Sequence, residues 1–285
     1  MKRQSGYSRG VMKHLDIQGA RLPVVGFGTS GLSGGHCERM VRFALDIGYR
    51  HIDTAPVYGT EAPVGAALAA TSVPRGEIFL TTKVWRADLR ARELRRSAEA
   101  SLRALRTGYL DLLLVHWPND AIPLAETFAA FAALKAEGKI RHAGVANFTL
   151  RHLRQLAGIE GAAPFCNQVE YHARLGRAQA PMLDHLRRNG IALVAYSPLG
   201  RGLLPRDPVL AAIGAKYGKS ASQVALRWLV EQDGVALITK SASEAHCREG
   251  IDVFDFELSP EDRAAIARHD DSTRVLDPSW APEWD

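Results

Sequence analysis

An acid, a phenol and an amine stand in one stretch of the sequence, each near the end of an apolar run. Asp53 ends a short apolar run, Tyr58 follows in the next loop, and Lys83 lies in the apolar run from 78 to 84. Singly, residues of these types are more often structural or solvated than functional. Together they could protonate an oxygen atom, because an ammonium at Lys83, held by Asp53, would lower the pKa of Tyr58 and make the phenol a general acid.

These residues need a scaffold that brings the ends of several strands together. Short apolar runs alternate with stretches of helical periodicity along the chain, which is typical of parallel βα units. Eight such runs predict an α/β fold, a closed (β/α)8 TIM barrel, formed by residues 1–285 as a single domain. The runs are residues 24–27, 51–53, 78–84, 110–116, 140–145, 165–169, 191–196 and 236–239.

The segments on either side of the barrel pattern have expected structures of their own. Residues 14–23, with Gly19 in the middle, predict an N-terminal β-hairpin, and residues 1–12 are expected to be disordered. The C-terminal tail, residues 275–285, is expected to fold over the barrel mouth. Two helix starts are also predicted: a capping box at 241–244, and an N-cap at Ser259 followed by a proline.

Composition restricts the classes of protein that this chain could belong to. Its 46% hydrophobic and 24% charged residues are ordinary for a globular protein. Three cysteines without a close pair favour a reducing compartment, and neither a signal peptide nor a membrane span is visible, so a cytoplasmic location is expected. The arginine-rich stretch 86–106 resembles the solvent-exposed face of an amphipathic helix. It has no interleaved aromatic residues on which bases could stack, so nucleic-acid binding is not expected. We expect a monomer without a metal.

One motif favours a different fold. Residues 26–31 match G-x-G-x-x-G, and Asp53 lies 22 residues after Gly31, near the position of the ribose-binding acid in a doubly wound dinucleotide fold. Against this alternative, Gly34 and Gly35 intervene before the helix pattern begins, and no tyrosine has a lysine four residues later as a short-chain dehydrogenase would require. The barrel is therefore the favoured fold.

Seven short motifs occur in an order typical of one known family. They are GFGT at 26–29, DTAPVYGTE at 53–61, TTKVW at 81–85, LLLVHWP at 112–118, NQVEYH at 167–172, AYSPLG at 195–200 and TKSAS at 239–243. From about residue 15 to 276 the chain resembles the aldo-keto reductases, and in particular bacterial members that reduce small ketones and aldehydes. The resemblance implies an NADPH-dependent oxidoreductase that transfers a hydride from the nicotinamide and reduces these carbonyls to alcohols.

The resemblance also implies a catalytic tetrad of Asp53, Tyr58, Lys83 and His116, with Tyr58 as the general acid. His116 would orient the carbonyl oxygen or share its proton. Around the substrate, apolar walls are implied for Phe27, Trp85, Trp117 and Trp280. Trp284 either lines the pocket or packs on the barrel rim, and Ser30 stands where many relatives have a tryptophan, which suggests a roomier pocket.

Cofactor contacts are implied in the same way. Tyr196 would stack on the nicotinamide, Asn147 and Gln168 would bind its carboxamide, and a cationic Lys240 would suit a 2′-phosphate. The remaining contacts implied are Gly28, Thr29, Asp53, Ser197, Leu199, Gly200, Ser241, Ser243, His246 and Glu249. Ala146, His246 and Gly250 replace the serine, arginine and asparagine that are usual in the family. Histidine lacks the guanidinium group with which arginine binds a phosphate through two hydrogen bonds. The preference for NADPH over NADH could therefore be weakened, and NADH is a possible cofactor.

Three other functions remain open from the residues alone. Lys83 or Lys240 could form a Schiff base in a barrel aldolase. The chain could also be a redox-sensing subunit that holds a nucleotide and turns over slowly. A hydrolase built on Ser197, His116 and Asp53 is conceivable, although no G-x-S-x-G motif occurs.

Overall fold

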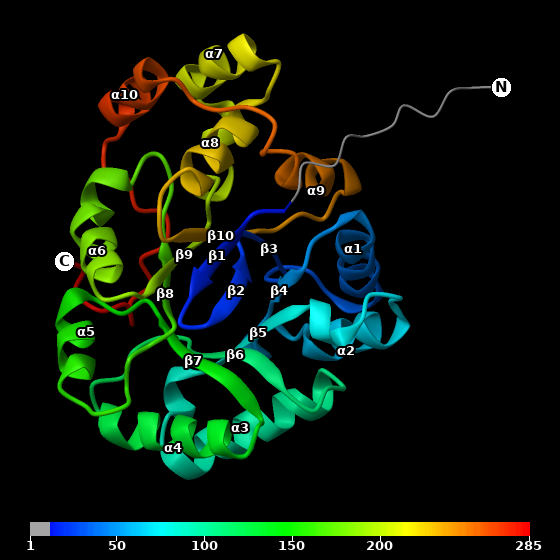
Figure 1. Ribbon diagram of the computed structural model, residues 1–285, viewed down its shortest axis with the longest axis vertical. Coiled ribbons are helices and arrows are strands. Elements are labelled where there is room, and N and C mark those ends of the chain that lie inside the picture. The colour runs from blue at the N-terminus through cyan, green and yellow to red at the C-terminus, as the bar shows by residue number, and fades with distance from the viewer. Residues whose placement is uncertain (1–11) are drawn as a thin grey trace.

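The computed structural model describes residues 12–285 (Figure 1). Residues 1–11, most of the stretch expected to be disordered, lie outside the described residues. Eight parallel strands close into a barrel in the order β10-β3-β4-β5-β6-β7-β8-β9, and the helices surround it (Figure 1). The predicted TIM barrel is confirmed, and the doubly wound alternative is wrong because the sheet has no open edge.

The barrel strands agree closely with the apolar runs of the sequence. They are β3 (Val25–Gly28), β4 (His51–Asp53), β5 (Phe79–Val84), β6 (Leu110–Val115), β7 (Ile140–Ala146), β8 (Cys166–Glu170), β9 (Ala192–Tyr196) and β10 (Val235–Thr239). Strands β4, β5, β6, β8 and β10 are buried at every residue. One face of each strand meets the barrel interior and the other meets the helices, which explains why the runs are continuously apolar rather than alternating.

Ten α-helices occur in the described part of the chain, together with five short 3-10 turns. The helices are α1 (Gly34–Ile47), α2 (Glu61–Ala70), α3 (Ala91–Ala104), α4 (Leu124–Ala136), α5 (Leu150–Ala157), α6 (Gly176–Arg188), α7 (Pro208–Tyr217), α8 (Ala221–Val230), α9 (Glu244–Ile251) and α10 (Pro260–His269). The turns are η1 (Pro56–Tyr58), η2 (Arg75–Glu77), η3 (Arg86–Asp88), η4 (Gly200–Gly202) and η5 (Leu204–Arg206). No helix among residues 12–285 combines the length and the apolar character that a membrane crossing requires.

Helix α3 contains most of the arginine-rich stretch. Its buried residues are Leu94, Ala98, Ser101 and Leu102, which lie on one side at helical spacing. On the exposed side Arg95 forms ion pairs with Glu99 and with Glu137, which follows α4. The amphipathic helix expected from the sequence is confirmed, and its positive charge is partly neutralised within the molecule.

The predicted hairpin is also present, as β1 (His14–Ile17) and β2 (Ala20–Pro23). Gln18 and Gly19 both have positive φ, 45° and 78°, as a tight hairpin turn requires. Figure 1 shows the hairpin lying across the centre of the barrel. Its Leu22 is fully buried and belongs to the same apolar cluster as Phe79 and Phe165, at the starts of barrel strands, so the hairpin closes the N-terminal end.

One of the two predicted helix starts is confirmed and the other is wrong. Ser259 is the N-cap of α10, and its side chain accepts a hydrogen bond from the backbone N–H of Asp262 at 3.1 Å. Helix α9, in contrast, begins only at Glu244 after Ser243. The Ser241 hydroxyl instead accepts from the N–H of Ser243 at 2.9 Å, which stabilises a turn ahead of the helix rather than its first turn.

The glycine motif at 26–31 has a packing role. Gly26 and Gly28 lie in β3, and a Cβ atom at either position would come within 2.6 Å of the Ile238 side chain on the neighbouring strand β10. Helix α1 starts only at Gly34. The glycines therefore permit close packing inside the barrel, and the match to a dinucleotide fingerprint is coincidental.

Candidate active site

The four tetrad residues meet at the C-terminal ends of neighbouring strands. Asp53 ends β4, Lys83 lies in β5, His116 directly follows β6, and Tyr58 closes the turn η1. The Lys83 ammonium donates to Asp53 Oδ1 at 2.5 Å and to the backbone oxygen of Thr54 at 3.0 Å. It lies 5.2 Å from the centre of the Tyr58 ring, and Tyr58 Oη lies 3.3 Å from His116 Nε2. The fold thus brings together four side chains that span 64 positions of the sequence.

Three threonines fix the loop that carries Tyr58. The hydroxyl groups of Thr29, Thr54 and Thr60 lie 2.9 Å from one another in a fully buried triangle. These residues follow β3, follow β4 and precede α2, respectively. Because the triangle ties both ends of the loop to the barrel, it restricts where Tyr58 can lie. Its residues were not recognised as a group in the sequence, where only Thr29 was predicted, as a cofactor contact.

Burial controls the electrostatics of the site. Burial alone would lower the pKa of the Lys83 ammonium, but the adjacent Asp53 carboxylate raises it above its ordinary value. Burial raises the pKa of the Tyr58 phenol, and the charge of Lys83 offsets only part of this effect. The expectation that Lys83 brings the pKa of Tyr58 below its ordinary value is therefore wrong for the free protein. Burial and the charge of Lys83 together lower the pKa of His116 to about 2, so its imidazole is neutral.

Two neutral, buried histidines predict that acid destabilises the fold. The pKa of His116 is lowered to about 2 and that of His51 to about 4, in both cases chiefly by burial. Below pH 6.5 the unfolded chain binds protons at these positions while the folded chain does not, so stability falls as the pH drops from 6.5 towards 4. Each histidine contributes a loss of up to about 1.4 kcal/mol per pH unit.

Urea unfolding at pH 7 and pH 5 measures this effect. We expect His116→Asn to reduce the difference in unfolding free energy between the two pH values by about 2 kcal/mol relative to the parent protein. An unchanged difference in that variant would show that His116 takes up a proton in the folded state.

Three of the predicted cofactor residues are connected to the tetrad. Gln168 donates from its side-chain amide to Asp53 Oδ2 at 2.9 Å. Asn147 donates to the backbone oxygen of His116 at 2.9 Å and accepts from the Tyr196 hydroxyl at 2.7 Å. These side chains line the same site, and their amide groups already have partners within the protein.

Two residues near this network have an unusual backbone conformation. Asn147 and Ser197 have φ values of 62° and 49°, in the left-handed region that non-glycine residues seldom adopt. Each directly follows a barrel strand, β7 or β9. Such strain commonly occurs where a side chain must be held in a fixed direction, as at a binding site.

The other predicted cofactor residues are distributed around the same end of the barrel. Lys240 is exposed, directly follows β10, and comes close to the loop between β3 and α1, where a Cβ at Gly31 would lie 3.9 Å from its Nζ. Ser243, His246 and Glu249 belong to α9 and its start, and Ser241 precedes them. Leu199 and Gly200 follow Ser197 at the start of η4. Thr29 is fully buried, and its hydroxyl is already bonded within the threonine triangle.

Aromatic rings surround the tetrad on the side of the tail. Trp85 lies 5.3 Å from the His116 ring and 6.3 Å from Trp280, and Trp117 lies 6.1 Å from Trp284. The C-terminal tail therefore lies beside the site as expected, and Trp284 packs on the rim against Trp117. Trp280 remains 46% exposed.

Phe27 does not belong to this aromatic group. Its side chain is fully buried, lies 5.8 Å from the Tyr49 ring and packs in the core between barrel and helices. The prediction that Phe27 lines the substrate pocket is wrong, because its neighbours Gly26 and Gly28 face the side of β3 that meets Ile238.

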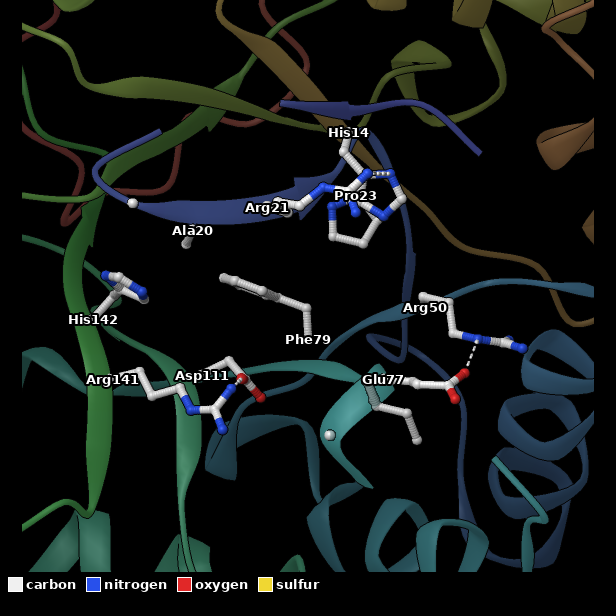
Figure 2. A pocket seen from close by; sticks show the side chains of 13 residues that line it. His14, Ala20, Arg21, Pro23, Arg50, Glu77, Phe79, Asp111, Arg141 and His142 are labelled. Atoms are coloured by element: carbon white, nitrogen blue, oxygen red, sulfur yellow. Dashed lines mark hydrogen bonds and ion pairs between the residues drawn. The ribbon is translucent and has the colours of Figure 1, made fainter. Parts of the chain in front are cut away.

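A cavity of about 550 Å³ lies at the opposite end of the barrel, beneath the hairpin (Figure 2). Phe79 projects into it, and four of its charged groups form ion pairs: Arg141 with Asp111 at 3.0 Å and Arg50 with Glu77 at 3.7 Å. None of its lining residues belongs to the tetrad. The four tetrad residues lie at the other, C-terminal end of the barrel, the end at which barrel enzymes have their active sites.

Among residues 12–285 no group of three or more histidine, cysteine, aspartate or glutamate side chains could hold a metal ion.

Glu170 and Arg274, which the sequence did not single out, lie close enough to Tyr196 for their charges to act on the pKa of its hydroxyl, in opposite directions. A signal existed for Glu170, since it is a charged residue at the end of a wholly buried strand.

Comparison with known proteins supports one family. The model described as "Aldo/keto reductase family" matches residues 24–271. An aldo-keto reductase of Mycolicibacterium smegmatis is 41% identical over 258 residues, which cover 90% of this chain and 93% of the relative. One of Mycobacterium ulcerans is 40% identical over 259 residues, covering 89% of each chain.

Comparison with solved structures supports the same family. A putative 2,5-diketo-D-gluconic acid reductase B superposes with a TM-score of 0.93 at 42% identity, over 98% of this chain and 99% of its own. An aldo-keto reductase of Bombyx mori, solved in complex with NADP, has a TM-score of 0.86 at 32% identity, over 94% and 96% of the two chains. By family model, by identity and by structure, this chain belongs to the aldo/keto reductase family.

Proposed function

We propose that this chain is an NADPH-dependent oxidoreductase that reduces aldehydes or ketones to alcohols, with Tyr58 as the general acid. The observation that carries the proposal is the contact of Tyr58 Oη with His116 Nε2 at 3.3 Å, beside the buried pair of Lys83 and Asp53. A proton donor, a neutral hydrogen-bonding group and a fixed cation thus lie around one point, where a carbonyl oxygen could be bound.

Each residue has a separate part in this proposal. Tyr58 keeps its proton at neutral pH, because burial raises its pKa, and transfers that proton to the carbonyl oxygen as the oxygen gains charge. Lys83, held by Asp53, then stabilises the phenolate that remains. His116 is neutral and, in the tautomer with hydrogen on Nε2, donates a hydrogen bond that positions the oxygen. The reduced nicotinamide, when bound, supplies the hydride to the carbonyl carbon.

The donor set at this end of the barrel suits a nucleotide phosphate. Lys240 is exposed and has no ion-pair partner among residues 12–285, so its charge is available to an anion. The hydroxyl of Ser241 lies beside it, and Tyr196, bound to Asn147 through its hydroxyl, offers a ring at the mouth. Two relatives that this chain resembles were solved with NADPH or NADP. These observations support NADPH as the cofactor.

The rival functions find less support. Lys83 is already bonded to Asp53 and its pKa is raised, which is unfavourable for a Schiff-base amine that must be uncharged. Borohydride trapping with a carbonyl substrate is expected to leave no adduct on Lys83 or Lys240. A binding subunit would hold the nucleotide without steady turnover. Measuring the steady-state rate of NADPH oxidation distinguishes this alternative from an enzyme.

A panel of aldehydes, diketones and keto-sugar acids, assayed by nucleotide absorbance with NADPH and with NADH, tests the reaction. We expect oxidation of NADPH with several members of the panel. Diketo-sugar acids are included because one relative is named as a putative reductase of such a compound. Absence of turnover with every carbonyl, in protein shown to bind NADPH, would contradict the proposal.

The identity of residue 246 predicts the choice between NADPH and NADH. His246 is exposed on α9, where the family usually has an arginine, and an arginine fork binds a phosphate in two places. We expect His246→Arg to tighten NADPH roughly tenfold and to change NADH by less than about twofold, measured by fluorescence titration. His185→Arg, which adds the same charge on α6, is the control. Equal tightening of both cofactors would show that His246 does not face the 2′-phosphate.

Oligomeric state and location complete the proposal. We propose a cytoplasmic location, supported by the three buried, unpaired cysteines Cys37, Cys166 and Cys247, and we propose that the protein is a monomer. Light scattering of the purified protein checks the monomer, and cell fractionation checks the location.

A further inference from the structure

Glu170 is a buried carboxylate that the proposed reaction does not use. It is the last residue of β8 and is 0% exposed. Its Oε1 accepts hydrogen bonds from His172 Nε2 at 3.1 Å and from the backbone N–H of Val275 at 2.7 Å, and its Oε2 accepts from the N–H of Leu276 at 2.9 Å. A carboxylate is costly to bury unless donors of this kind surround it, so the contacts with residues 275 and 276 are part of what keeps it there.

His172 fixes the orientation of this carboxylate. The ring of His172 is also 0% exposed, and its Nδ1 accepts from the backbone N–H of Arg174 at 3.3 Å. An accepting Nδ1 leaves the hydrogen of a neutral ring on Nε2, which therefore donates to Glu170. The pair is thus rigid on the barrel side, and the bonds to Val275 and Leu276 are its connection to the tail.

The tail beyond Leu276 reaches the proposed substrate site. Trp280 lies 6.3 Å from Trp85, which itself lies 5.3 Å from the His116 ring. The side-chain hydrogen bonds made further along the tail are at the surface: Trp284 donates to Asp277, and Asp285 accepts from the N–H of Leu150. Exposed contacts compete with water and hold a segment weakly, whereas the charged bonds of Glu170 are sheltered from it.

Glu170 also lies next to Tyr196, a residue of the proposed cofactor site. Glu170 is paired with Tyr196 in the register of β8 and β9, and the N–H of Tyr171 donates to the backbone oxygen of Tyr196 at 3.4 Å. The end of β8 is therefore bonded both to the strand that carries Tyr196 and, through Glu170, to the segment that leads to Trp280.

We propose that Glu170 is a positioning residue that holds the tail over the barrel mouth and thereby sets the affinity for carbonyl substrates with an apolar body. Its effect on substrates rests on the proposed reductase function, whereas its effect on the tail does not. The carboxylate acts through Val275 and Leu276, and it touches neither the tetrad nor the reacting atoms.

Hydrogen exchange in the free protein tests the anchoring by itself. We expect Glu170→Gln to speed exchange of the amides of residues 275–285 at least about tenfold, a loss of about 1.4 kcal/mol of local protection, with the barrel strands unchanged. Asp277→Ala removes only an exposed tail contact, the hydrogen bond that Asp277 accepts from Trp284, and is expected to change the same amides less than about threefold. Val275→Pro removes one tail donor without altering the barrel, and it should reproduce the effect even if Glu170→Gln fails to fold.

Steady-state kinetics with NADPH then test the consequence for substrates. With benzaldehyde we expect Glu170→Gln and Val275→Pro to raise KM about tenfold while kcat changes less than about threefold, because the tetrad is intact. Equal rates of amide exchange in the tail of parent and variants would overturn the proposal. Faster exchange in the tail of the variants with an unchanged KM would overturn it as well. Failure of the parent protein to reduce any carbonyl would refute the reductase instead, and the exchange result would still decide whether Glu170 anchors the tail.

Discussion

Replacing Tyr58 with phenylalanine is expected to lower kcat for carbonyl reduction by roughly 10²- to 10⁴-fold, the usual contribution of a general acid. The substitution removes one oxygen atom, the one that lies 3.3 Å from His116 Nε2. It leaves the ring and the buried pair of Lys83 and Asp53 in place. The loss corresponds to about 3 to 5 kcal/mol of barrier height, and initial rates with saturating NADPH and a reactive aldehyde measure it.

Binding of NADPH is the control for this variant. The Tyr58 hydroxyl is not among the groups that we assign to the nucleotide, so its dissociation constant should change less than about threefold, as measured by fluorescence titration. Threonine 60, whose hydroxyl belongs to the buried triangle near the same loop, provides a matched variant. Thr60→Ser keeps that hydroxyl and should retain most of the activity. Parent-like turnover in Tyr58→Phe would rule out this phenol as the acid.

Replacing Lys83 with methionine should reduce both stability and activity. The lysine is 1% exposed, and its removal leaves the Asp53 carboxylate buried with the amide of Gln168 as its remaining side-chain donor. Removing one partner of a buried ion pair typically costs about 3 to 5 kcal/mol, so we expect a loss of this size in the free energy of urea unfolding. Carbonyl reduction should fall by at least about 10²-fold, because the phenolate of Tyr58 loses its stabilising cation.

A double variant separates these two effects. Asp53→Asn combined with Lys83→Met replaces both charges, so no uncompensated ion remains and most of the lost stability should return. Activity should not return, since the cation beside Tyr58 is still missing. If the double variant were as unstable as Lys83→Met, the instability would come from lost packing of the lysine stem rather than from a buried charge.

The barrel and the tetrad could be predicted from the sequence for a physical reason. Parallel strands in a closed barrel all have their C-terminal ends at one face, so polar residues at or near the ends of successive apolar runs must converge. Asp53, Lys83 and His116 each stand at such a point, and the structure places them together. The motifs around them, such as DTAPVYGTE at 53–61 and TTKVW at 81–85, are by themselves sufficient to indicate the family.

The direction of side chains in the buried strands could not be predicted in this way. Strand β3 is buried on both faces, so its apolar pattern does not tell which residues point into the barrel. Phe27 was therefore expected at the substrate pocket but packs outward against Tyr49. The spacing of Ser241 to Glu244 was likewise compatible with a capping box, and only the position at which α9 begins excludes it.

What the sequence determined by itself was the order of the strands, the family, and the four side chains that we propose as the tetrad. Only the tertiary structure decided how strongly each group is desolvated, which is why the pKa of Tyr58 is raised rather than lowered. It also decided which partners lie nearby: the threonine triangle, and the bonds from Val275 and Leu276 to Glu170, join residues as much as 106 positions apart. Burial and such long-range contacts depend on the packing of the whole chain, and no local pattern records them.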